Sequence, residues 1–166
     1  TALCIALVFS LGVFSHTPLT VDNQAEAAVK PKKDFERDVD LVICLDCSGS
    51  MSGLLNLTRE KIWDMVNEFS KAKPKPNLRV SLFSFGSNEA PGDGHVVKLT
   101  DLTKDLDKVS EKLFALRAAG GTEYVGRALN HAMAKLDWSK QKNALKIIFV
   151  AGNESANQDK ESNYIE

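Results

Sequence analysis

Hydrophobic residues gather in short runs at intervals along the chain, and these runs predict the strands of a sheet. Residues 39–45 (VDLVICL), 79–85 (RVSLFSF) and 144–151 (ALKIIFVA) are rich in aliphatic and β-branched side chains. Runs of this composition are typical of central parallel strands that are buried on both faces. The shorter stretch at residues 95–99 predicts an edge strand.

Between these runs, hydrophobic residues recur every three or four positions, which is the spacing of one face of an α-helix. Such stripes extend over residues 55–69, 102–116 and 125–136. Strands that alternate with helices and are joined by right-handed crossovers predict an α/β fold. We therefore expect a doubly wound, mainly parallel, Rossmann-like sheet with helices on both faces. The polar stretch 153–166 offers no closing element, so we expect this fold to be incomplete at its C-terminus.

The N-terminal residues predict export. Residues 2–14 form an uncharged apolar run that is shorter than the ~20 residues a membrane-spanning helix needs, but long enough for the core of a signal peptide. Small residues at Ala25, Ala27 and Ala28 offer a cleavage site. We expect a signal peptide at 1–28 whose start is missing, a charged lead-in at 29–38 and a partial domain at 39–166. An uncleaved anchor is the alternative.

Composition narrows the function classes. The 166 residues are 43% hydrophobic and 26% charged, with a formal net charge of −1 and a pI of about 6.3, as in an ordinary globular domain. A near-neutral chain does not fit a nucleic-acid binder that works through a basic surface. Three cysteines are too few for a disulfide scaffold. Cys44 and Cys47 are three apart on a predicted strand, so we expect two buried thiols.

The candidate chemistry lies in the loops that follow the predicted strands. Asp46, Ser48 and Ser50 place a carboxylate and two hydroxyls at alternate positions after the first strand. Thr122 adds a hydroxyl after two glycines. Hard divalent cations take oxygen ligands of these kinds, and the carboxyl ends of strands meet at one edge of such a sheet. The alternative is that these side chains only cap the next helix and stabilise a turn.

This pattern resembles the von Willebrand factor type A (VWA) domain family and its metal-ion-dependent adhesion site. The apolar strand that ends at residue 45, followed by Asp46-x-Ser48-x-Ser50 and later by Gly-Gly-Thr122, carries the resemblance. The resemblance implies Asp46, Ser48, Ser50 and Thr122 as metal ligands. Family members usually add an Asp after the fourth parallel strand, where this chain has Gly152. Asn153 and Glu154 are the neighbouring candidates for that role.

The resemblance also implies a mechanism of binding. A bound Mg²⁺, or Mn²⁺ or Ca²⁺ in its place, keeps uncompensated positive charge and favours an Asp or Glu carboxylate from a protein partner. We expect an exported protein-binding domain, periplasmic, cell-surface or secreted, with no nucleic-acid partner and no small-molecule substrate. The alternatives are a metal-independent scaffolding or assembly module and a regulatory module of a larger complex.

An enzyme is not expected. The segment 49–53 (GSMSG) does not place serine at the centre of a nucleophile elbow, and Ser48 stands where a phosphatase of the haloacid-dehalogenase type needs a second Asp. The sequence holds neither a phosphate-binding loop nor a dinucleotide fingerprint. His131 is expected on a helix surface and His95 at an edge strand, away from any nucleophile.

Overall fold

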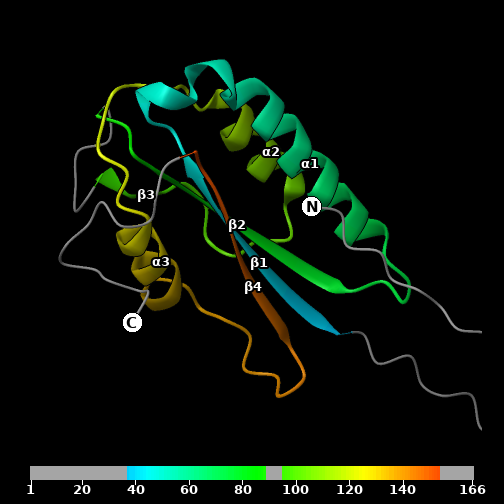
Figure 1. The fold of residues 1–166 in the computed structure, drawn as a ribbon. Helices are drawn as coiled ribbons and strands as arrows, with labels where there is room; N and C mark the ends of the chain where they lie inside the picture. The colour runs from blue at the N-terminus through cyan, green and yellow to red at the C-terminus, as the bar shows by residue number, and fades with distance from the viewer. Residues whose placement is uncertain (1–36, 89–94, 154–166) are drawn as a thin grey trace, which may run out of the picture. The chain divides into compact units, whose positions relative to one another are not determined.

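The computed structural model describes residues 37–88 and 95–153, and within these ranges four strands form one sheet in the order β3-β2-β1-β4. Strands β1 (Asp38–Asp46), β2 (Asn77–Phe85) and β4 (Leu145–Ala151) are parallel, and β3 (Val97–Lys98) is antiparallel to β2. Chain order reverses at β1, since β2 lies on one side of it and β4 on the other (Figure 1). Ligands bind beyond the carboxyl end of the strand at which such a sheet reverses.

Helices cover both faces of the sheet, which confirms the predicted α/β class (Figure 1). A short 3-10 helix, η1 (Gly49–Gly53), leads into α1 (Leu55–Lys71), and α2 (Leu106–Ala115) and α3 (Val125–Ala134) follow. Buried side chains of α1 and α2 pack with β1 and β2 in one core cluster. Two alanines of α3 pack in a second cluster on the other face.

The two core clusters follow the alternation of side chains along β1. Leu41, Ile43 and Leu45 belong to the cluster that contains α1 and α2, whereas Val42 and Cys44 belong to the cluster that contains α3. Cys44 and Cys47 are both buried and are free thiols, as the sequence predicts. Burial raises the pKa of each thiol to about 12, so both are neutral at physiological pH.

Local hydrogen bonds shorten several predicted elements. The helix predicted over 102–116 begins at Leu106, because the side chain of Asp105 caps its first turn by accepting from Lys108 N at 3.0 Å. Just before it, the backbone of Thr103 exchanges two hydrogen bonds with Val80 of β2, which holds this segment extended. The edge strand predicted over 95–99 is reduced to two residues of β3.

Burial differs from the sequence prediction at two places. β4 is the last strand of the sheet within the described part of the chain, and its Leu145 and Phe149 side chains are 36% and 37% exposed rather than buried. His131, expected on a helix surface, is 8% exposed on α3, so that expectation was wrong. The other buried residues of α3 are Gly126, Ala128 and Ala132, whose small size allows this face of the helix, with His131, to pack closely.

The predicted signal peptide at 1–28 and most of the lead-in at 29–38 lie outside the described residues and stay predictions. Asp38 of that lead-in is the first residue of β1. Within 37–88 and 95–153, no helix has the length and apolar character needed to cross a membrane.

Candidate metal centre at the carboxyl edge of the sheet

Asp46 ends the central strand and carries a carboxylate that is only partly satisfied. Its residue is 1% exposed, and its Oδ1 accepts a hydrogen bond from the backbone N–H of Ser48 at 2.8 Å. Its Oδ2 is buried and has no hydrogen-bond partner among the described residues. Burial raises the pKa of Asp46, hydrogen bonding from Ser48 and from the backbone of Asn153 acts against that rise, and the negative charge of Glu123 adds to it. The ionised form therefore lacks a compensating charge.

Three polar side chains form a chain of contacts beside this carboxylate. Ser48 Oγ and Ser50 Oγ are 2.9 Å apart, and Ser50 Oγ donates to Asn153 Oδ1 at 3.1 Å. Because the Ser50 proton is used in that bond, Ser48 is the donor in the first pair. The contacts bring the loop after β1 together with the first residues after β4. Both serine oxygens keep lone pairs, which is what a hard cation requires of a hydroxyl ligand.

Close backbone approach joins the remaining loops. Ala119 N donates to Cys47 O at 2.9 Å, which attaches the loop before α3 to the loop after β1. A Cβ on Gly121 would lie 2.1 Å from Gly86 O, so only glycine allows these two loops to meet. Thr122 follows at once and is exposed. The structure thus brings the second predicted loop to the carboxyl edge, although the contacts described do not link Thr122 directly to Asp46.

Glu123 is the site residue that the sequence analysis missed. It is 8% exposed, and a Cβ on Gly86 would lie 3.4 Å from Glu123 Cγ and 2.8 Å from Asp46 Oδ1. The two carboxyl side chains therefore flank the same small space above a glycine whose φ is +79°. In the sequence, Glu123 resembles an ordinary solvated acid just before a helix. Its position directly after a candidate ligand, Thr122, was the only available signal.

The position that family members fill with Asp stands directly against Asp46. A Cβ on Gly152 would lie 3.1 Å from both Cβ and Oδ2 of Asp46. Glycine at 152 therefore places no side chain of its own beside this oxygen. Glu154, named with Asn153 as a candidate, lies outside the described residues. Within the described ranges, no three His, Cys, Asp or Glu side chains cluster as a metal site, so any cation would depend on hydroxyl ligands as well.

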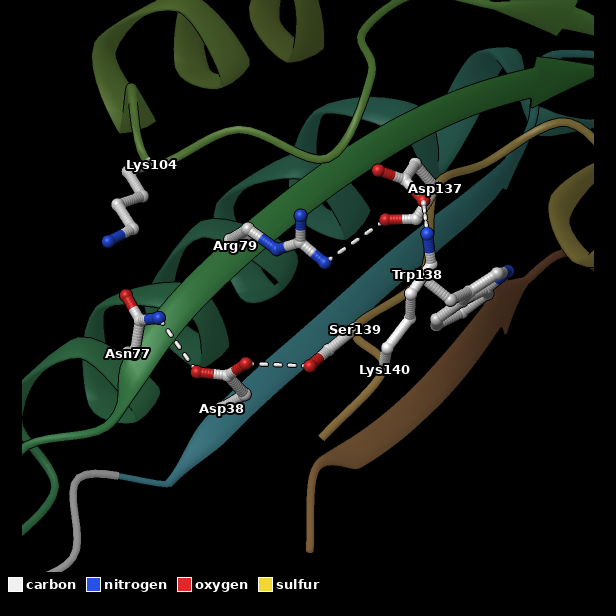
Figure 2. A pocket seen from close by; sticks show the side chains of 8 residues that line it. All are labelled: Asp38, Asn77, Arg79, Lys104, Asp137, Trp138, Ser139 and Lys140. Carbon is white, nitrogen blue, oxygen red and sulfur yellow. Dashed lines mark hydrogen bonds and ion pairs between the residues drawn. The ribbon is translucent and has the colours of Figure 1, made fainter. Parts of the chain in front are cut away.

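The amino-terminal end of the parallel strands holds a polar cavity of about 370 Å³, in which the carboxylate of Asp38 is fully hydrogen-bonded (Figure 2). Asp38 accepts from Asn77 Nδ2 at 2.7 Å and from Ser139 Oγ at 2.6 Å. Arg79 reaches the backbone oxygen of Asp137 at 3.2 Å. Both carboxylate oxygens of Asp38 thus have a donor, unlike Oδ2 of Asp46.

Comparisons with known proteins agree with this architecture. A sequence profile of the von Willebrand factor type A domain matches residues 40–165. Comparison with curated protein sequences gives no significant match.

Several solved structures share the fold. The von Willebrand factor domain of the type V pili tip protein Mfa5 from Porphyromonas gingivalis is 26% identical, with a TM-score of 0.51 over 68% of this chain. The pilus adhesin SpaC from Lactobacillus rhamnosus GG is 21% identical (TM-score 0.56, 69% of this chain), and the SpRpn10 VWA domain is 17% identical (TM-score 0.55, 75%). The chain spans 36%, 14% and 64% of those three chains, so each relative is longer than the matched part.

Proposed function

The chain belongs to the von Willebrand factor type A domain family, and from this premise we propose that it is an exported domain that binds a protein partner through a divalent cation. The proposed ligands are Asp46, Ser48, Ser50 and Thr122. Asn153 takes part through its contact with Ser50. Mg²⁺ is the first candidate, with Mn²⁺ and Ca²⁺ as alternatives, because the donor set consists of hard oxygens.

The observation that carries the proposal is the orphaned Oδ2 of Asp46. A buried polar atom without a partner costs about 1–3 kcal/mol, and more if the group is charged. Buried polar groups in native proteins nearly always have a partner, and that partner can be a bound ion or an ordered water. Here the orphaned oxygen lies at the end of β1, and Ser48 and Ser50, which follow that strand, also offer oxygen lone pairs. A cation would satisfy Asp46 and use those lone pairs at the same time.

The charge of such a site explains the kind of partner. One carboxylate and neutral hydroxyls leave a divalent cation with net positive charge, and a bound cation then acts as a Lewis acid for an external oxygen ligand. An Asp or Glu side chain of the partner is the strongest ligand of this type. The residues of this chain hold the cation at an edge of the sheet where a partner can approach, since Ser50 and Thr122 are exposed.

Likeness to surface proteins supports the proposed location and role. The Mfa5 relative is described as a pili tip protein, and binding at a cell surface or outside the cell agrees with the predicted signal peptide at 1–28. We extend this to the chain as a proposal that it is exported and acts by binding. No catalytic role, nucleic-acid partner or small-molecule substrate belongs to this proposal.

A metal-independent scaffolding role is the second candidate, and Gly152 favours it. Without a carboxylate at that position, the loop after β4 contributes a backbone and the amide of Asn153. In that case the same edge would bind partners through hydrogen bonds alone, and chelation of divalent cations would leave binding unchanged.

Calorimetric titration of the full chain with Mg²⁺ and Mn²⁺ distinguishes the two functions. We expect binding by the wild type, loss of binding in Asp46→Asn, and no change in Asp64→Asn, whose carboxylate is exposed on α1. Thermal unfolding gives a second readout, because cation at one hundred times its Kd should stabilise the wild type by about 2.7 kcal/mol. Equal behaviour of the wild type and Asp46→Asn would reject the metal site and favour scaffolding.

A further inference from the structure

We propose that Glu123 supplies the second carboxylate of the cation site, in place of the Asp that family members carry after the fourth strand and that is Gly152 here. The inference rests on the proposed function, because it names a further ligand of the same site. It assigns that role to the loop before α3 rather than to the end of β4.

The first argument is the shared space above Gly86. A single added carbon at that glycine would touch both carboxyl side chains, at 2.8 Å from Asp46 Oδ1 and 3.4 Å from Glu123 Cγ. The backbone of Gly86 adopts a φ of +79°, which side chains other than glycine rarely tolerate. The sequence thus keeps this position free of a side chain where Oδ1 of Asp46 and the side chain of Glu123 lie close to the same backbone.

The second argument is that one member of the pair lacks a partner. Asp46 is 1% exposed and its Oδ2 has no donor among the described residues, so a positively charged group beside this oxygen would be favourable. The structure offers no basic side chain within hydrogen-bond distance of that oxygen in the described ranges. A divalent cation held by Asp46 and Glu123 would give the orphaned oxygen a positive partner.

The third argument concerns the position of Gly152. A Cβ at position 152 would lie 3.1 Å from Asp46 Oδ2, so an Asp at 152 would place its carboxylate beside the same oxygen. With glycine there, the second negative charge must come from another loop if the site is to hold a cation as firmly as two carboxylates do. Glu123 is the buried acid that the structure places beside Asp46.

The inference changes the expected partner chemistry. Two carboxylates balance the charge of a divalent cation, so the pull on a partner carboxylate is weaker than with one. The cation then binds a neutral oxygen ligand of the partner, such as a backbone carbonyl or a side-chain amide, with an affinity closer to that for Asp or Glu.

Mn²⁺ titration of the full chain with Glu123→Gln tests the assignment. Gln keeps the size and hydrogen-bonding capacity of the side chain but removes its charge. We expect the Mn²⁺ affinity to fall ~10–100-fold, as it does when a carboxylate ligand or its close support is lost. The matched control Glu111→Gln, an exposed acid on α2, should bind within twofold of the wild type.

A rescue experiment separates ligation from a structural role. Adding Gly152→Asp to Glu123→Gln returns a carboxylate to the other side of Asp46 and should restore most of the lost affinity. Gly152→Ala in the same background should not. Thermal unfolding, measured once in EDTA and once in saturating Mn²⁺ without EDTA, completes the test. If Glu123 is a ligand, Glu123→Gln loses the Mn²⁺-induced rise in unfolding temperature. If Glu123 is only structural, the variant unfolds at a lower temperature in EDTA and keeps that rise.

The outcomes are distinguishable. Wild-type binding with unchanged affinity in Glu123→Gln, or a lowered stability in EDTA with an intact Mn²⁺ response, overturns the role of Glu123 and leaves the proposed function standing. Absence of Mn²⁺ binding by the wild type overturns both.

Discussion

Two aspartates of the same strand, Asp40 and Asp46, are equally buried but very differently supported. Asp40 is 0% exposed, and its two oxygens accept from Arg79 at 2.8 Å each, with a further bond from Ser139 N at 2.6 Å. Asp46 is 1% exposed and has one oxygen that no described residue satisfies. The two residues are six positions apart along β1, so their side chains lie on the same face of the sheet, near opposite ends of the strand.

The difference separates a carboxylate that stabilises the fold from one that is available to a ligand. At the amino-terminal edge, a bidentate arginine and a backbone N–H complete the coordination of Asp40, which leaves no site for an added cation. At the carboxyl edge, Ser48 satisfies only one oxygen of Asp46. Such an incomplete site lowers stability in the absence of a ligand and returns it when the ligand binds.

The largest effect is expected from Asp40→Asn. The substitution removes the carboxylate that forms the ion pair with Arg79, whose side chain is 25% exposed, and leaves a partly buried guanidinium without that partner. We expect the free energy of unfolding to fall by about 3 kcal/mol, since breaking a buried pair is strongly destabilising. Urea unfolding at pH 7 in EDTA measures it. Asp64→Asn, which breaks a surface pair of 3.7 Å, should change the same quantity by under about 0.5 kcal/mol.

Asp46→Asn should have a smaller effect of opposite sign in the same assay. Asn keeps an oxygen acceptor for Ser48 N and removes a buried charge that lacks a partner. We expect stability in EDTA to rise by about 1 kcal/mol. Added Mn²⁺ should stabilise the wild type but not this variant. A loss of stability in EDTA as large as that of Asp40→Asn would mean that Asp46, like Asp40, is a structural residue and is not kept available for a ligand.

The same contrast shows what the sequence can predict. The buried strand β1 and the polar loop after it follow from residue types alone, because apolar runs predict strands and oxygen side chains after strands predict a ligand edge. In the structure Ser48 lies between β1 and η1, and Ser50 lies in η1. Fold class depends on patterns that repeat over many residues, and it is confirmed.

Other features depend on contacts that no local pattern encodes. Glu123 is buried beside Asp46 only because glycines at 86 and 121 let two distant loops meet, and this contact joins residues far apart in the chain. The start of α2 at Leu106 depends on the pairing of Thr103 with Val80, which overrides a regular helical stripe. Burial of His131 likewise follows from packing and not from its helical position.

The smallest effect on the free energy of unfolding is expected at Asp38, and this effect should depend on pH. Hydrogen bonds from Ser139 and then Asn77 hold the pKa of this carboxyl below its usual value of 3.8. The folded state therefore favours the ionised form, and the contribution of Asp38 to stability is complete above pH 3.8 and is lost as the pH falls through its lower folded pKa.

Asp38→Asn should consequently be less stable than the wild type at pH 7 by a modest amount, and this difference should shrink below pH 3.8. Urea unfolding of both proteins at pH 7, 5 and 3 measures it, with Asp64→Asn as the exposed control. A difference that stayed constant with pH would show that Asn77 and Ser139 recognise the shape of the side chain rather than its charge. Asp38 would then be held by neutral hydrogen bonds, in contrast to Asp40, which forms an ion pair with Arg79.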